Sequence, residues 1–497
     1  MNTFKKAAFC LIFFFIFKSS LAFGASLYGE KIELPESLNI SSLKFRGVWV
    51  DTVWNNFPSK PGLSEEDYKK EYMTLLKNLE KAHINTVIFQ VRPSCDAFYK
   101  SHGNPASEFL TGKQGENFNF DPLAWMIEET HKKGMTFHAW LNPYRVTYRN
   151  AEGSKEELIS TLHPANFARK NPGCVFKAGK KLYLKPWDEK VVIHLKETVQ
   201  ELLKKYEVDA IHFDDYFYPA STFVGSGGYY EEEKEAFEQS GVKNLGDYRR
   251  QQTDNLVFGV FQTVQSYNRV EGKNVEFGVS PAGVWRNKST DPSGMEVLTN
   301  YTSYDTLFAD TKKWVENRWV DYIVPQIYWQ FDTKAAPYGN CTDWWGKVCS
   351  NAKVKLYIGH AIYKLAQGDW KNSEELYNQL LFNTRYDSIY GSFFFNSKAF
   401  KENTSQKNKD FLEKYKNEIK NLKTPESVSP KKEKLSFKLH RTGNGTLLSW
   451  VYDGECSGFK LIKNEMELAK IKKAGKSYFF LDFNENEVSE YKIEVEP

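Results

Sequence analysis

Short apolar runs recur along most of the chain and alternate with segments whose apolar residues have helical spacing. Runs rich in β-branched and aromatic residues predict strands, and the segments between them predict amphipathic helices. One helix is predicted to begin at Asp121-Pro122, with the aspartate as N-cap and the proline as first helical residue. The predicted strands are 45–50, 86–92, 135–140, 209–214, 275–280, 321–328, 355–360 and 390–396.

Strands that alternate with helices indicate an α/β fold, and eight such strands predict a (β/α)8 TIM barrel. A doubly wound open sheet is the alternative, but no glycine-rich phosphate turn follows the first strand. Segments that follow strands are long and those that lead back into strands are short. The long βα loops therefore gather at the face of the barrel where active sites lie. They are 94–120, 143–186, 219–245, 281–305 and 330–352.

The two ends of the chain differ from this middle part. Lys5 and Lys6 precede a short apolar run, which predicts a signal peptide and an exported protein with no stable membrane span afterwards. An uncleaved N-terminal anchor is the alternative. After the last predicted barrel helix, a charged segment with prolines indicates a linker, and alternating strands follow that are typical of a small β-sandwich of fibronectin type III kind. The predicted divisions are 1–25 for the signal peptide, 45–423 for the barrel, 424–434 for the linker and 435–497 for the sandwich.

The composition narrows the class of partner. The net charge is only +4 and no basic stripe is interleaved with aromatic residues, so a nucleic-acid partner is not expected. Aromatic residues make up 16% of the chain, which suits either a large core or stacking surfaces for flat apolar ligands. No metal-binding spacing of Cys and His appears, so we expect neither a metal nor another cofactor. Cys341 and Cys349 are near enough in sequence to pair, but free buried thiols are equally compatible.

The fourth predicted strand ends in a burst of carboxylates and aromatic rings, His212-Phe213-Asp214-Asp215-Tyr216. Because side chains alternate along a strand, His212, Asp214 and Tyr216 share one face. We expect Asp214 to face the barrel lumen and Asp215 to turn at the rim. Two carboxylates this close favour holding a proton on one of them, which is what a general acid requires.

Other strands also end in polar and aromatic side chains at spacing two, and their convergence at one end of the barrel predicts a binding site. For any one of them, a satisfied core residue, an ion pair or loop packing is the alternative; the stacking candidates include the loop residues Trp344 and Trp345. The predicted catalytic residues are Asp214 and Asp215. The predicted substrate-binding residues are Arg92, His138, Asn142, Arg145, His212, Tyr216, Trp285, Gln326, Tyr328 and Trp329.

These motifs resemble glycosyl hydrolase-like family 10, also known as DUF187, a distant relative of the α-amylase clan. The matching stretches include Arg46-Gly47-Val48-Trp49-Val50, Phe89-Gln90-Val91-Arg92-Pro93 and Pro325-Gln326-Ile327-Tyr328-Trp329. The resemblance implies a (β/α)8 barrel in an exported bacterial protein that hydrolyses glycosidic bonds. It also implies peptidoglycan strands stripped of their peptides as substrate. One departure is Leu184-Lys185-Pro186-Trp187, where the family tends to have Asp-Pro-Gly.

Asp214 supplies one catalytic carboxylate, and glycosidases usually need two. Glu276 lies at the start of its strand and should point away from the mouth, which leaves loop residues for the second role. The alternative is the 2-acetamido group of the substrate acting as nucleophile, with one of Asp214 and Asp215 as acid and the other orienting the amide. The expected function is hydrolysis of cell-wall glycan that contains N-acetylhexosamine; the alternatives are an amylase-type hydrolase of α-glucans and a non-catalytic carbohydrate-binding envelope protein. The candidate loop acids are Asp51, Asp96, Asp291, Asp305 and Asp332.

Overall fold

The computed structural model describes residues 25–496 except 54–55, 220–227, 231, 369, 371, 422–434, 436, 443–444, 453, 455, 474–476 and 483–488. The predicted linker and, apart from Ala25, the predicted signal peptide lie outside the described residues.

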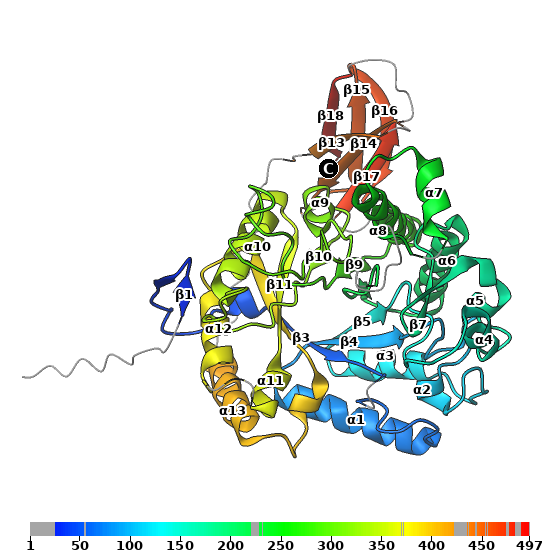
Figure 1. The fold of residues 1–497 in the computed structure, drawn as a ribbon. Helices are drawn as coiled ribbons and strands as arrows, with labels where there is room; N and C mark the ends of the chain where they lie inside the picture. Colours follow the sequence, from blue (N-terminus) through cyan, green and yellow to red (C-terminus); the bar gives the residue numbers. More distant parts are fainter. Residues whose placement is uncertain are drawn as a thin grey trace, which may run out of the picture.

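Eight parallel strands close into a barrel in the order β10-β11-β12-β3-β4-β5-β8-β9 (Figure 1). The predicted TIM barrel is therefore confirmed. Strand β10 is much shorter than expected because Pro325 lacks an N–H and interrupts the ladder. The strands are β3 (Phe45–Val50), β4 (Thr86–Arg92), β5 (Thr136–Leu141), β8 (Ala210–Phe213), β9 (Glu276–Val279), β10 (Tyr322–Ile323), β11 (Lys355–His360) and β12 (Ile389–Phe394).

Helices surround the barrel and cover the outer faces of its strands (Figure 1). The Asp121 side chain accepts a hydrogen bond from the backbone N–H of Ala124, as predicted for the N-cap of the helix that begins at Pro122. The helices are α1 (Glu65–Lys81), α2 (Glu108–Thr111), α3 (Pro122–Lys132), α4 (Lys155–Ser160), α5 (Phe167–Lys170), α6 (Glu189–Lys205), α7 (Glu233–Ser240), α8 (Leu245–Glu271), α9 (Thr311–Glu316), α10 (Tyr338–Ala352), α11 (Ile362–Gln367), α12 (Glu375–Asn383) and α13 (Gln406–Asn421). Cys341 and Cys349 are buried free thiols on α10.

A hairpin within the long segment after β5 forms part of the barrel mouth and was not predicted. Its strands are β6 (Val175–Ala178) and β7 (Lys181–Leu184), which pair antiparallel. The segment that leaves β5 is bonded to β7, because Val146 N donates to Leu182 O at 3.0 Å and Leu184 N donates to Tyr144 O at 2.7 Å. The hairpin is therefore a fixed wall of the mouth.

The barrel interior is filled by aromatic side chains, and glycines make room for them. Tyr322 crosses the lumen over Gly278, where a Cβ would lie only 2.0 Å from the ring. This contact matters for function because the Tyr322 hydroxyl reaches two histidines below the mouth. The cluster comprises Trp49, Ile88, Trp140, Ala210, Tyr322, Val324, Tyr357 and Phe393.

The C-terminal region forms two small antiparallel sheets, which lie beside α8 and α9 at the top of Figure 1. Trp450, Phe459 and Tyr478 are buried between them, and Phe479 packs against Phe261 of α8 with ring centroids 5.4 Å apart. One strand, β16, was not predicted. The sheets consist of β13 (Phe437–Thr442), β14 (Gly445–Val451) and β17 (Ser477–Asp482), and of β16 (Met466–Lys472), β15 (Gly458–Lys463) and β18 (Tyr491–Glu496).

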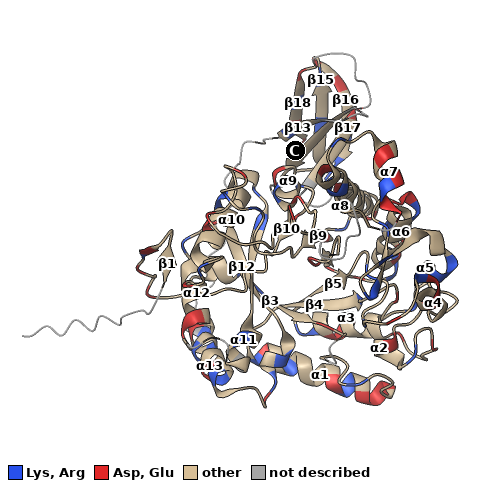
Figure 2. Cartoon of the chain, viewed as in Figure 1, with Lys and Arg blue, Asp and Glu red and all other residues tan. Residues whose placement is uncertain are grey.

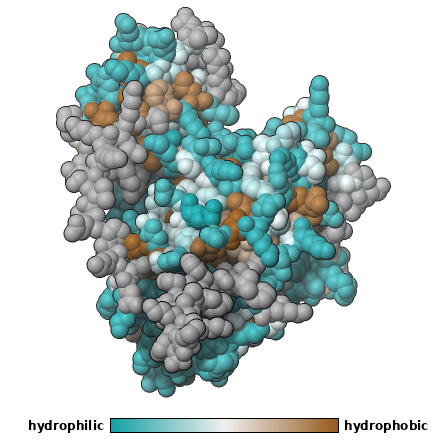
Figure 3. Space-filling view, turned by 90° about the vertical axis from the view of Figure 1, so that its left-hand side faces the viewer, coloured by the Kyte–Doolittle hydropathy of each residue, from teal (hydrophilic) through white to brown (hydrophobic). Residues whose placement is uncertain are grey.

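The outer surface is mostly polar. Charged residues of both signs lie along outer helices such as α1, α7 and α13 (Figure 2). The face in Figure 3 is largely hydrophilic, with scattered small apolar patches rather than one continuous apolar surface. Among the described residues, no helix combines the length and apolarity needed to cross a membrane.

We expect Gly278→Ala to lower the free energy of unfolding by about 1–3 kcal/mol, because the added methyl group forces the Tyr322 ring to move within a packed lumen. The matched control is Gly259→Ala on α8, where a Cβ would meet only the flexible Lys196 side chain at 3.3 Å. That variant should gain about 0.5–1 kcal/mol from helix propensity. Urea unfolding measures both, and a Gly278→Ala protein as stable as the parent would contradict the packing constraint.

Candidate active site

A cavity of about 510 Å³ opens at the carboxyl ends of the barrel strands, and side chains from most of the strand ends line it. The predicted site residues that line it are Arg145, Asp214, Asp215, Tyr216, Gln326 and Tyr328. The other lining residues are Trp49, Asp51, Val53, Gln90, Trp140, Tyr148, Arg149, Asn150, Lys181, Ser280 and Phe395.

Asp214 is buried in the wall of this cavity and is held by three N–H donors. Trp140 Nε1 donates to its Oδ2 at 2.9 Å, and Asn142 Nδ2 donates to the same oxygen. The backbone N–H of Tyr216 donates to Oδ1 at 3.2 Å. The carboxylate is therefore fixed in position, and Oδ1 keeps capacity to accept a hydrogen bond from a ligand.

A chain of side-chain amides determines how Asn142 faces Asp214. Gln90 Oε1 accepts from the backbone N–H of Thr52 at 3.0 Å, so its Nε2 is left to donate to Asn142 Oδ1 at 2.7 Å. Arg145 Nη2 donates to the same Asn142 oxygen at 2.6 Å. Because a backbone N–H can only donate, the whole chain is oriented so that Asn142 offers its N–H to Asp214.

Asp215 follows directly and is half-buried at the edge of the cavity. Burial and the neighbouring charge of Asp215 raise the pKa of Asp214 above its ordinary value. Burial also raises the pKa of Asp215, although a hydrogen bond from Gln326 and the charge of Arg145 oppose the rise. The pair therefore holds a proton at a higher pH than two isolated carboxyl groups would.

Arg145 connects the carboxylate pair to the aromatic rim. Its guanidinium carbon lies 5.0 Å from the ring centroid of Tyr216 and 5.4 Å from that of Tyr148, within the range of cation–π contacts. The Tyr216 side chain is half-exposed, which leaves a ring face for a sugar to stack on. Arg145 thus organises both the charged and the aromatic side of the cavity.

His138 and His212 lie beneath the cavity rather than in its lining. Trp49 Nε1 donates to His212 Nε2 at 3.3 Å, so the His212 proton lies on Nδ1 and is donated to the Tyr322 hydroxyl at 3.0 Å. That hydroxyl in turn donates to His138 Nδ1 at 2.9 Å. Burial lowers the pKa of His138 to about 4 and that of His212 also, so both rings are neutral at neutral pH.

Arg92 is also placed below the cavity. Its Nη1 donates to the backbone carbonyls of Asn142 and Pro143 at 2.6 and 3.3 Å, and its side chain is fully buried. These bonds hold the main chain that carries Asn142 and Arg145 into the mouth. In this structure Arg92 therefore positions other site residues.

The predicted stacking tryptophans lie outside the cavity lining. Trp285 is buried, donates to Asp310 Oδ1 at 3.0 Å and stacks on Trp344 with centroids 5.5 Å apart. Trp345 is fully buried and donates to Gly283 O at 2.8 Å, and Trp329 also lies outside the lining. The segment 184–187, which differs from the family motif, also lies outside the cavity lining, and its Lys185 forms an ion pair with Glu232.

Only Asp51, of the five loop acids considered for a second catalytic role, lines the cavity. Asp291 and Asp305 pair with Arg286, and Asp96 is buried with Ser94 and Gln114. Asp51 Oδ1 accepts from Asn56 and Asn396 at 2.9 and 2.7 Å, and the residue is 1% exposed. It lies after β3 and is thus on a different wall from the Asp214–Asp215 pair.

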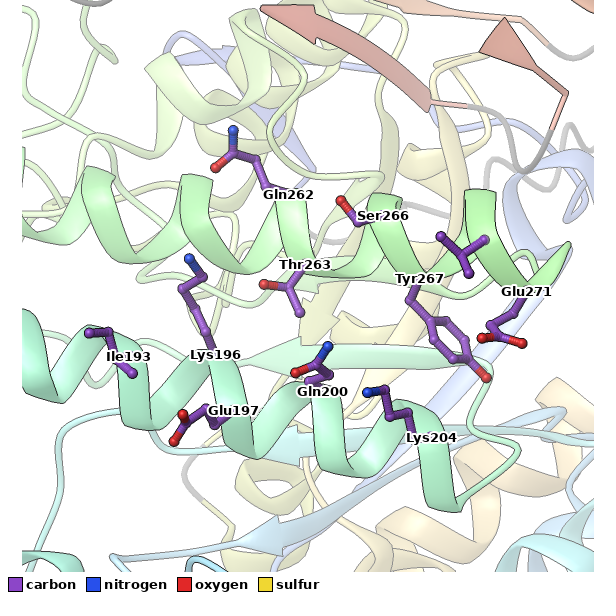
Figure 4. Close-up of a pocket in the computed structure, with 11 residues that line it drawn as sticks. Ile193, Lys196, Glu197, Gln200, Lys204, Gln262, Thr263, Ser266, Tyr267 and Glu271 are labelled. Carbon is purple, nitrogen blue, oxygen red and sulfur yellow. The ribbon is translucent and has the colours of Figure 1, made fainter.

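A second groove, of about 570 Å³, lies outside the barrel between α6 and α8 (Figure 4). It is lined by the outward faces of these helices and contains no predicted site residue. Among the described residues, no group of three or more His, Cys, Asp and Glu side chains is arranged to hold a metal ion. The barrel mouth is therefore the candidate active site.

Residues 44–378 match the family model described as Glycosyl hydrolase-like 10. The chain belongs to this family. It is 38% identical over 435 residues to glycosyl hydrolase YngK of Bacillus subtilis (strain 168), which covers 84% of this chain and 81% of that protein. It is 37% identical over 381 residues to glycosyl hydrolase DigH of Escherichia coli (strain K12), which covers 73% and 84% respectively. The predicted family is therefore confirmed.

We expect Asp215→Asn to stabilise the protein more at pH 8 than at pH 4. The pKa of Asp215 is raised on folding, so the native state binds this proton more tightly than the unfolded chain, and stability is lost as the pH rises through the raised value. The amide removes that cost, and the gain should grow by about 1–2 kcal/mol between the two pH values. Urea unfolding at both pH values measures it. Glu156→Gln on the exposed face of α4 is the control, and an equal pH effect in both variants would contradict the expectation.

Proposed function

We propose that this protein is an exported glycoside hydrolase that cleaves glycosidic bonds of cell-wall glycan containing N-acetylhexosamine, with peptide-free peptidoglycan strands as substrate. The observation that carries the proposal is the Asp214–Asp215 pair, whose pKa values are raised together in a cavity walled by aromatic rings. A carboxyl group that keeps its proton near neutral pH can protonate a departing sugar oxygen. Export rests on the signal-peptide pattern of Lys5, Lys6 and the apolar run after them.

The two carboxyl groups have different freedom, which divides their roles in this proposal. Asp215 is half-buried at the cavity edge and serves as general acid. Asp214 is locked by Trp140, Asn142 and Tyr216, and its Oδ1 accepts the N–H of the 2-acetamido group. A fixed acceptor there orients the acetamido oxygen toward C1 of the sugar.

The reaction then has two steps. The acetamido oxygen attacks C1, the glycosidic C1–O bond breaks, and the departing oxygen takes the proton of Asp215. Water next adds to C1 and returns a proton to Asp215 while the bond from C1 to the acetamido oxygen breaks. This route needs no carboxylate beyond the pair. Asp51, whose Oδ1 is held by Asn56 and Asn396, has no step in it.

Asp215→Asn and Asp214→Asn should each lower kcat by about 10²–10⁴-fold, because one removes the proton donor and the other the fixed acceptor. The parent rate should have a bell-shaped pH dependence, because the active pair holds one proton: the rate should fall at low pH as both carboxyl groups become protonated and at high pH as both become ionised. The measurement is saccharide release from purified peptide-free glycan strands, with Glu156→Gln as the control. Equal saccharide release by the parent and the variants would contradict the catalytic roles proposed for Asp214 and Asp215. Release from starch alone would indicate an amylase-type enzyme, and binding without release would indicate a carbohydrate-binding protein.

Attack of the acetamido oxygen on C1 closes an oxazolinium ring. A thiazoline derived from N-acetylglucosamine is a stable analogue of this ring and should inhibit competitively. Asp51→Asn should keep kcat within about tenfold of the parent, because Asp51 does not form a bond to the sugar in this route. A loss of about 10³-fold or more in Asp51→Asn, together with no thiazoline inhibition, would instead identify Asp51 as the nucleophile of a two-carboxylate mechanism.

A further inference from the structure

The wall of the cavity formed by the β6–β7 hairpin carries positive charge. Lys181 of β7 lines the cavity together with Arg145 and Arg149. The hairpin holds Lys181 there, because β7 is bonded to the segment Tyr144–Thr147 through Val146 and Leu184. The cluster therefore belongs to a fixed wall.

Lys181 is a cation without a balancing anion nearby. Its side chain is half-buried, and its Nζ makes no hydrogen bond or ion pair with any residue in the described part of the chain. The ammonium lies 5.6 Å from the ring centroid of Tyr148, the same ring that Arg145 approaches. Burial and the positive charge of Arg145 lower the pKa of Lys181.

The neighbouring lysine behaves differently. Lys180, at the turn of the hairpin, pairs with Glu152 and has a side chain that is 57% exposed. Arg149 at the rim is 71% exposed, lies 3.6 Å from Glu108 in a long ion pair and lies 5.9 Å from the ring centroid of Phe109. The cavity wall thus keeps two cationic donors, Lys181 and Arg149, available to a ligand, whereas the surface lysine beside them is already neutralised.

We propose that Lys181 and Arg149 form a subsite for a carboxylate group of the glycan. The assignment rests on the proposed function and narrows its substrate. In peptidoglycan, every second sugar carries a lactyl group, whose carboxylate is free only where the stem peptide has been removed. A peptide-linked lactyl group is a neutral amide, which gives a half-buried cation no compensating charge. The subsite therefore makes the hydrolase selective for peptide-free strands and against neutral chitin.

The test compares glycan strands with a free lactyl carboxylate, the same strands after conversion of the carboxylate to a methylamide, and chitin oligosaccharides. Binding and the separate values of kcat and KM are measured for the parent, Lys181→Gln, Lys181→Arg and Lys180→Gln. The parent should have a KM about fivefold to tenfold lower for the free carboxylate than for the amide. Lys181→Gln should lose this preference, whereas Lys181→Arg and Lys180→Gln should keep it, all without a matching change in kcat.

Several results would overturn the subsite. These are equal binding of carboxylate and amide by the parent, or an equal loss on both substrates in Lys181→Gln with the fold intact by thermal unfolding. Carboxylate-dependent binding without turnover would contradict the proposed hydrolysis and support the subsite. Hyaluronan, whose carboxylate belongs to a uronic acid, separates the two sources of this group: tighter binding of hyaluronan than of peptide-free strands would overturn the lactyl assignment.

Discussion

The backbone N–H of Thr52 can only donate a hydrogen bond, and the arrangement of the barrel mouth depends on this constraint. It occupies Gln90 Oε1, which turns the Gln90 amide toward Asn142 and then the Asn142 amide toward Asp214. The residues of this hydrogen-bonded series lie at or just after the ends of β3, β4, β5 and β8, which are consecutive in the barrel. The closed barrel therefore sets the direction of the hydrogen bond from Asn142 to the buried carboxylate, and neither amide can rotate without breaking the bond to the other.

A second series of hydrogen bonds lies below the first and is also oriented by a group that can only donate. The indole N–H of Trp49 is also only a donor, and it fixes the proton positions of His212, Tyr322 and His138 in turn. Both imidazoles stay neutral because burial lowers their pKa values. The floor of the site thus contributes hydrogen bonds without adding charge under the carboxylate pair, and Gly278 is required because the Tyr322 ring occupies the space above it.

The sequence was sufficient for the architecture and for the lumen-facing residues of β8, but not for depth within the barrel. Spacing of two along β8 put His212 and Asp214 on the lumen side, and both are there, yet one lies in the floor and the other in the cavity wall. Which layer a residue occupies depends on the tilt and stagger of the strands, and these are set by pairing across the whole barrel.

The elements that were missed have physical reasons as well. Strand β16 consists of Met, Glu, Leu, Ala, Lys and one Ile, which are mostly residues with high helix propensity, and it forms a strand by pairing with β15. The β6–β7 hairpin owes its place to hydrogen bonds with residues far back in the chain, so nothing local indicated that Lys181 would face the cavity. Trp285 was predicted to stack on the substrate because an indole ring suits a sugar face, but it lies buried against Trp344 and Asp310.

Arg145 influences the protonation of both the Asp214–Asp215 pair and Lys181 in the barrel mouth. Burial and mutual repulsion favour protonation of Asp214 and Asp215, while Arg145 favours their ionised forms. Arg145 also lowers the pKa of Lys181 on the neighbouring hairpin, so one guanidinium favours the ionised form of the carboxyl groups and the neutral form of the amine. A ligand carboxylate next to Lys181 would offset the repulsion between Lys181 and Arg145. Arg145 therefore couples the protonation of the Asp214–Asp215 pair to the charge of the hairpin wall in one small cavity.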